Sequence, residues 1–129
     1  MQTLKELAAG VQIKAEQGAA RLAWDKRDEW QQNANDWRIT LSYKGRRHSF
    51  DFWQGVGIKN APDAAGVLEC LLSDAQSAGD GFDEFCANMG YDSDSRKAER
   101  IYKACEKTHE RLSVLFGEDY QKFIDAERD

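Results

Sequence analysis

The feature that most constrains the fold is a change in the spacing of apolar residues at the only proline, Pro62. Before this proline, the segments WRITLSY and HSFDFW alternate apolar with polar residues, which is typical of half-buried β-strands. After it, apolar residues recur every three or four positions, as they do in amphipathic helices. The sequence therefore predicts an α+β fold in which a sheet comes first and helices follow.

The N-terminal half, residues 1–61, is expected to hold a small antiparallel sheet of two to three strands. WRITLSY and HSFDFW predict a hairpin, and KGRR between them supplies the turn. The earlier segment VQIKAEQ also alternates and predicts another strand. Residues 18–35 are compatible with either a short helix or an excursion into the next strand.

The C-terminal half, residues 62–129, is expected to hold three to four helices that cover one face of this sheet, because so small a sheet needs a cover. We expect one domain, 1–129, made of these two halves. A short helix is also predicted at the N-terminus, from Leu4 to Ala9. The helical stretches of the second half have their apolar positions within residues 64–75, 82–89, 98–116 and 120–124.

The charge of the chain is unevenly distributed. The formal net charge of −5 divides into +3 for residues 1–61 and −8 for residues 62–129. With 41% hydrophobic residues, the chain is too apolar for a disordered protein. We find no apolar run long enough to span a membrane and no signal-peptide pattern, so a cytoplasmic location is expected.

Catalytic and metal-binding chemistry has little support in the sequence. The three cysteines, Cys70, Cys86 and Cys105, are widely spaced and fall on apolar faces, so we expect reduced, mostly buried and unreactive thiols. His48 is expected to be exposed and His109 to lie at the edge of the core. No zinc pattern, nucleophile with a base, cofactor motif or catalytic residue is indicated, so the interpretation is non-enzymatic. QGVGIKN resembles a phosphate loop only loosely.

The segment GYDSDSRKAER, residues 90–100, is the densest group of potential ligands. It does not match a calcium loop, because Arg96 and Lys97 stand at two of the positions that such a loop requires. A helix start explains it better: Gly90 would end one helix, and the oxygens that follow would cap the next. Tyr91 and Arg96 remain candidates for an exposed functional role.

The hairpin tip is a candidate nucleic-acid site. Lys44, Arg46, Arg47 and His48 stand together in the predicted turn, where they are placed to contact phosphates. A solvated charged turn is the commoner explanation. In addition, the acidic helical half would be repelled by a nucleic acid that binds at the tip. Direct nucleic-acid binding is therefore the alternative hypothesis.

Several segments together resemble a family of small accessory proteins encoded by phages and prophages. They are WRITL, a GRR-containing turn, F-x-F followed by QGVG, PDAAGVLECLLSDA, GFDEFCANMGYDSDSRKAERIYKAC and LFGEDY, and they span Trp37 to Tyr120. The string GYDSDSRKAE is the most specific. The resemblance implies a phage origin and a setting where inhibitors of host defence, of the anti-CRISPR or antirestriction type, are frequent. It implies no catalytic residue.

The leading hypothesis is a protein that binds a host defence protein or ribonucleoprotein complex through an acidic surface that mimics phosphates. Ordinary solvated helix faces are an equally good explanation for any single acid. Trp53, Tyr91 and Arg96 complete the candidate surface, the first two as aromatic anchors. The candidate acids are Asp74, Asp80, Asp83, Glu84, Asp92, Asp94, Glu99, Glu106 and Glu110. The sequence predicts no oligomeric state.

Overall fold

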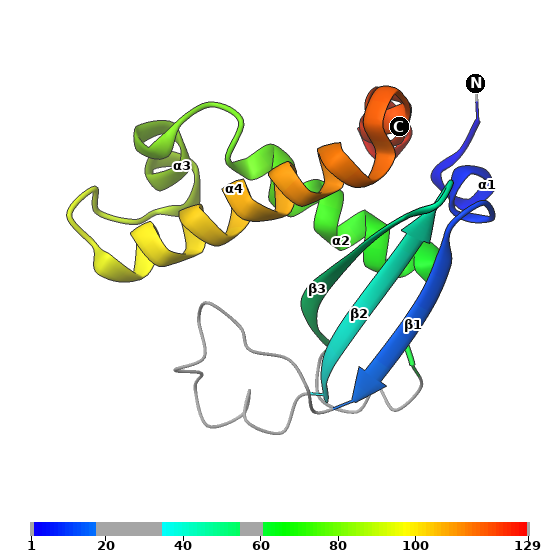
Figure 1. The fold of residues 1–129 in the computed structure, drawn as a ribbon. Coiled ribbons are helices and arrows are strands. Elements are labelled where there is room, and N and C mark those ends of the chain that lie inside the picture. Colours follow the sequence, from blue (N-terminus) through cyan, green and yellow to red (C-terminus); the bar gives the residue numbers. More distant parts are fainter. Residues whose placement is uncertain (1, 18–34, 55–60, 129) are drawn as a thin grey trace.

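The computed structural model describes residues 2–17, 35–54 and 61–128, and Figure 1 shows their arrangement. The chain begins with a short helix α1 and three strands and then becomes helical, as the apolar spacing predicts. Its elements are α1 (Leu4–Ala8), β1 (Gln12–Gln17), β2 (Asn35–Tyr43), β3 (Arg46–Gln54), α2 (Ala64–Ser77), α3 (Phe82–Met89), α4 (Arg96–Phe116), the 3-10 turn η2 (Gly117–Asp119) and α5 (Tyr120–Arg128).

The three strands form one antiparallel sheet in the order β1-β2-β3. Ile39 pairs with Ala15 on one side and with Phe50 on the other, so these three side chains share a face. Ile39 and Phe50 are buried. The opposite face carries polar side chains such as Thr40 and Ser49, whose hydroxyls lie 3.2 Å apart. The alternation in the sequence therefore gives the sheet one apolar and one polar face.

Helices α2, α4 and α5 pack with the apolar face of the sheet around the main hydrophobic core. Leu72 of α2 and Leu112 of α4 are both fully buried there. Phe116 and Phe123 stack with their ring centroids 3.9 Å apart, and the ring of Tyr43 meets each of them edge-on. This aromatic cluster brings the end of β2 against the last turn of α4 and against α5.

Local capping explains where the helices begin and end. The side chain of Asp63 accepts a hydrogen bond from the backbone N–H of Gly66 and starts α2. Ser95 accepts from the N–H of Ala98 in the same way and starts α4. Gly90 ends α3 with φ at 75°, a left-handed conformation that glycine adopts without steric cost. The helix-start interpretation of residues 90–100 is confirmed.

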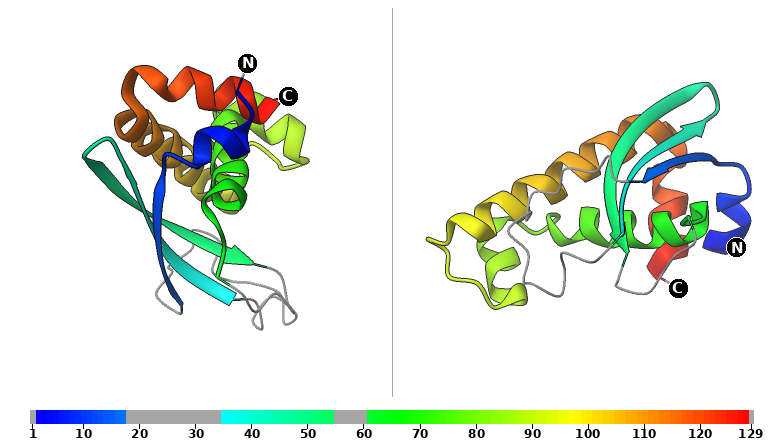
Figure 2. Two further views of the ribbon diagram at one scale, coloured as in Figure 1. Left: turned by 90° about the vertical axis from the view of Figure 1, so that its right-hand side faces the viewer. Right: turned by 90° about the horizontal axis from the view of Figure 1, so that it is seen from below.

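A second, smaller core lies apart from the sheet. Phe85, Cys86 and Ala98 are buried in it, and the rings of Phe82 and Tyr102 pack edge to face with centroids 5.3 Å apart. This core joins α3 to the first turns of α4. Figure 2 shows α3 and the start of α4 projecting from the part of the molecule that contains the sheet. We call residues 78–95, which comprise α3 and its two connections, the α3 lobe.

The hairpin differs in one respect from the sequence prediction. The turn contains only Lys44 and Gly45, both with positive φ (46° and 80°), as a tight two-residue hairpin requires. Tyr43 pairs directly with Arg46, so strand β3 includes Arg46, Arg47 and the residues after them. The expectation that KGRR forms the turn was therefore wrong. Because Arg46 and Arg47 belong to strand β3, their side chains project from opposite faces of the sheet.

Candidate functional site

The α3 lobe carries the largest group of exposed carboxylates without basic neighbours in the sequence. Chain positions 60–95 contain eight Asp and Glu residues but no Lys, Arg or His. Five of the eight lie in the lobe, and all five are exposed. They are Asp80, Asp83, Glu84, Asp92 and Asp94. The net charge of the whole helical half hides this uninterrupted stretch, which is nevertheless readable in the printed sequence.

Met89 adds an apolar contact point to the lobe. Its side chain is 51% exposed at the end of α3, and it is one of two large exposed hydrophobic residues among those described. Tyr91, which follows the Gly90 cap, is half-buried and has its ring centroid 6.4 Å from that of Phe85. A flexible methionine side chain can adapt its shape to a partner, so Met89 offers the lobe one apolar contact point.

The carboxylates of α4 have a different setting. Glu99, Glu106 and Glu110 are exposed, but basic residues alternate with them along the helix. Glu99 forms a 2.8 Å ion pair with Lys103, and this hydrogen bond and charge lower the pKa of Glu99. Arg96 is exposed in the first turn of α4. The acidic surface is therefore concentrated on the α3 lobe, and the exposed side of α4 is of mixed charge.

Asp74 lies at the junction of α2 and α4, not on the lobe. It is half-buried, and desolvation raises its pKa to about 6. Its charge contributes to raising the pKa of Cys105 on α4, which burial brings to about 12. Because the charged form is disfavoured at this position, Asp74 is less suited to docking a basic partner than the exposed lobe acids.

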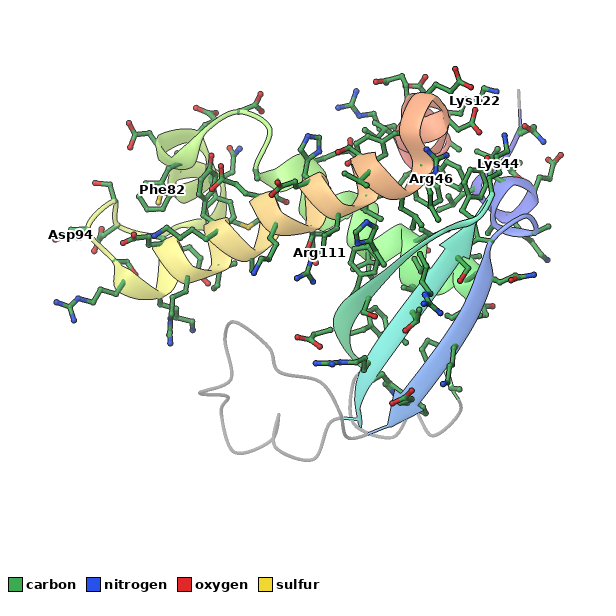
Figure 3. The ribbon with its side chains drawn as sticks, viewed as in Figure 1. Lys44, Arg46, Phe82, Asp94, Arg111 and Lys122 are labelled. Atoms are coloured by element: carbon green, nitrogen blue, oxygen red, sulfur yellow. The ribbon has the colours of Figure 1, made fainter. Side chains whose placement is uncertain are left out.

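The hairpin tip is held by a long-range polar contact. The Nζ of Lys44 lies 2.8 Å from the Oδ2 of Asp119, and the Tyr43 hydroxyl donates to the same oxygen at 2.6 Å. Lys122 contacts the other carboxylate oxygen at 3.4 Å. Asp119 is 7% exposed, and the hydrogen bond from Lys44, followed by that from Tyr43, lowers its pKa far below the usual value. Lys44 is thus neutralised by a buried carboxylate, and Figure 3 shows Lys44, Arg46 and Lys122 at this end of the molecule.

The other three basic residues of the hairpin do not form one cluster. Arg46 and His48 lie on the face of β3 that the helices cover, since they pair with Tyr43 and Leu41. Arg47 is exposed on the opposite, polar face. Nothing in the described part of the chain forms an ion pair with Arg46 or Arg47. His48 is half-buried, so the prediction that it is exposed was wrong; strand alternation explains its position.

The thiols differ from the sequence prediction in one case. Cys86 and Cys105 are buried, as expected, but Cys70 is exposed on α2. Apolar spacing placed Cys70 beside the buried positions Leu71 and Leu72, yet it falls just outside the face that packs on the core. His109 shares a 2.9 Å hydrogen bond with the hydroxyl of Tyr120, so it has a polar partner as expected. It is nevertheless exposed and does not lie in the margin of the core.

Metal binding and membrane insertion find no support in residues 2–17, 35–54 and 61–128. These residues contain no group of three or more His, Cys, Asp and Glu side chains arranged to hold a metal ion. None of the helices in this part of the chain is long and apolar enough to cross a membrane. The expectations for residues 18–34, for the glycine-containing segment 55–60 and for the side chain of Trp53 lie outside the described residues.

Comparisons with family models, with curated proteins and with solved structures find no match to this chain. Any function must therefore be inferred from the residues and their geometry. Two surfaces stand out, the acidic α3 lobe and the basic end of the hairpin. Asp94 of the lobe and Lys44 of the hairpin lie at opposite ends of the molecule in Figure 3.

Proposed function

We propose that this chain is a non-enzymatic accessory protein of a phage or prophage. It binds a host macromolecule through the α3 lobe and inhibits a bacterial defence complex of the CRISPR or restriction type. It acts in the host cytoplasm on a protein or ribonucleoprotein partner. The observation that supports this most is the set of five exposed lobe acids, in a stretch of the chain without a single basic residue.

The geometry of the lobe suits a basic partner surface. Asp83 and Glu84 lie in the first turn of α3, while Asp92 and Asp94 lie in the connection to α4. Proteins that handle nucleic acids hold phosphates with Lys and Arg, and carboxylates at the end of a projecting element attract such a surface. Met89 supplies apolar area within the same lobe, which a purely electrostatic contact would lack.

The lobe also has the rigidity that recognition requires. Phe85 anchors α3 in the smaller core, and Gly90 and Ser95 fix the connection to α4 at its two ends. These contacts hold the backbone that carries the carboxylates, which reduces the backbone ordering that binding requires. The phage setting comes from the sequence resemblance described above, and the lobe supplies the surface that such an inhibitor uses.

The proposal is tested with a charge variant and a matched control. Asp80→Asn, Asp83→Asn and Glu84→Gln together remove three lobe charges, whereas Glu69→Gln, Glu118→Gln and Asp125→Asn remove three from exposed sites outside both the lobe and the candidate acids. Each protein is expressed in bacteria that carry a CRISPR or restriction system, and the plating efficiency of a targeted phage is measured. Wild type and control should restore plating, and the lobe variant should not.

Affinity capture with the same three proteins should recover a component of the defence complex with wild type and control only. A wild-type protein that restores plating against none of the defence systems and captures no defence component overturns the proposal. If the lobe variant restores plating and captures the partner as well as wild type does, the lobe is not the binding surface.

A second candidate function uses the other end of the molecule. Arg47 is exposed on the polar face of the sheet with no ion pair among the described residues, so it is available to a phosphate. On this hypothesis the chain is a regulator that binds nucleic acid through the hairpin tip. Arg46→Ala with Arg47→Ala should then weaken DNA or RNA binding and reduce its salt dependence. A wild-type protein that shifts no nucleic acid in a low-salt gel excludes it.

A further inference from the structure

A pocket of about 420 Å3 opens at the turn end of the sheet. This volume lies within the range of small-ligand sites, roughly 300–1,000 Å3. Six of the residues that line it carry the argument: Gly10, Gln12, Ser42, Lys44, Arg46 and Arg47. The pocket contains basic and neutral polar groups and no carboxylate of its own.

Three of these side chains form one row across the sheet. Gln12 pairs with Ser42, and Ser42 pairs with Arg47, so all three project from the polar face at the same level. The row offers an amide, a hydroxyl and a guanidinium, one from each strand. Each can donate a hydrogen bond to an oxygen, and the guanidinium also carries a full positive charge.

The charges around the row are not balanced. Lys44 is paired with Asp119, but Arg46 and Arg47 have no ionic partner among the described residues. Arg46 lies on the other face, and its guanidinium packs beside Gly117. A Cβ added to Gly117 would lie 2.5 Å from Nη1 of Arg46. Arg47 is therefore in a position for direct contact, and Arg46 contributes positive potential from nearby.

We propose that this pocket binds a terminal phosphate group, carried either by a small phosphorylated ligand or by the end of an oligonucleotide. A phosphate monoester presents three terminal oxygens and about two negative charges near pH 7. The three donors, one from each strand, match those three oxygens. A ligand carboxylate has only two oxygens and would leave one donor of the row without a partner. The proposal is independent of the α3 lobe and deepens the nucleic-acid hypothesis by naming the group that is bound.

The test is a titration of the whole chain, followed by amide NMR signals, at low ionic strength and in a buffer free of phosphate. The probes are adenosine monophosphate, inorganic phosphate and adenosine. Adenosine monophosphate should shift the amide signals of Gly10, Ser42 and Gly45 in a saturable way, inorganic phosphate should shift the same signals more weakly, and adenosine should not shift them.

Two arginine variants and one lysine control locate the contact. Arg47→Gln should weaken the binding of adenosine monophosphate about tenfold or more, because it removes a charge-assisted hydrogen bond. Arg46→Gln should weaken it only a few-fold. Lys14→Gln removes an exposed positive charge from the polar face outside the pocket, where Lys14 is paired with Glu16, and should change binding less than about twofold.

Oligonucleotides with and without a 5′-phosphate separate the two sources of the group. Tighter binding of the phosphorylated strand places the site at a nucleic-acid end, while equal binding of both strands together with saturable adenosine monophosphate binding assigns a small ligand. The proposal is overturned if adenosine monophosphate gives no saturable shift, if adenosine binds equally well, or if Arg47→Gln binds like wild type. These results leave the lobe hypothesis, tested by phage plating, unaffected.

Discussion

The hydroxyl of Tyr43 donates a 2.6 Å hydrogen bond to Oδ2 of Asp119, and so joins the end of β2 to the 3-10 turn that follows α4. The two residues are 76 positions apart in the chain. The ring of Tyr43 also packs against Phe116 and Phe123. One side chain therefore links the sheet to the C-terminal helices through both a polar and an apolar contact.

Removal of the Tyr43 hydroxyl should lower stability while the ring packing remains. Tyr43→Phe is expected to reduce the free energy of unfolding by about 1.5–3 kcal/mol, as loss of a hydrogen bond to a charged group does. Urea unfolding monitored by circular dichroism measures this. Tyr102→Phe is the control, since its hydroxyl makes only a 3.5 Å contact with the carbonyl of Ala78. Equal loss in both variants would contradict the prediction.

Asp74 should make stability depend on pH. Its pKa is raised to about 6 in the folded chain, so the folded state binds the proton more tightly than the unfolded state. The resulting stabilisation is complete below the unfolded pKa, about 4, and is lost as the pH rises to about 6. Asp74→Asn should therefore stabilise the protein at pH 7 by on the order of 2 kcal/mol and have little effect near pH 3.

Urea midpoints at the two pH values, for wild type and variant, provide the measurement. Asp80→Asn is the matched control, because its carboxylate is exposed and should change the pH profile little. A stabilisation by Asp74→Asn that is the same at both pH values would assign the effect to packing and not to proton binding.

Thiol labelling should distinguish the three cysteines. Cys70 is exposed, while Cys86 and Cys105 are buried. Burial raises the pKa of Cys105 to about 12, which leaves almost no thiolate at neutral pH. A thiol reagent should therefore label one cysteine quickly in the native protein and all three after denaturation. Cys70→Ala should abolish the fast reaction, and a fast phase that persists in this variant would place the reactive thiol elsewhere.

The two cores should respond separately to truncation. Phe85→Ala empties the smaller core under the α3 lobe, and Phe123→Ala empties part of the main core. Each should cost about 3–5 kcal/mol where the cavity forms. Hydrogen exchange should show loss of protection confined to α3 and the first turns of α4 for Phe85→Ala, but across sheet and helices for Phe123→Ala. Global loss in both variants would mean that the lobe and the rest unfold together.

Much of the fold follows from local rules in the sequence. The alternation in WRITLSY and HSFDFW predicted which face of the hairpin is apolar, and Gly90 ends a helix where it was expected to do so. The two-residue turn was missed because KGRR also suits a longer loop, and only the pairing of Tyr43 with Arg46 decides between them.

The contacts that shape the candidate sites are less accessible to sequence reasoning. The hydrogen bonds to Asp119 depend on how α4 and η2 approach the hairpin, and no local pattern encodes that approach. Cys70 shows the same limit, since a shift of a fraction of a turn decides whether a residue at the margin of an apolar stripe is covered. The lobe acids were identified singly from the sequence. The run of residues 60–95 without Lys, Arg or His already separates them from the mixed charges of α4, and only their exposure required the fold.

Helix α4 runs without a break through 21 residues, from the smaller core to the aromatic cluster beneath the hairpin. At 1.5 Å per residue, this is a rod of roughly 31 Å. The helix therefore sets the distance between the acidic α3 lobe and the basic hairpin tip. A macromolecule that binds the lobe and the hairpin tip at once must carry a basic and an acidic surface separated by a similar distance. A shorter partner can bind only one of the two.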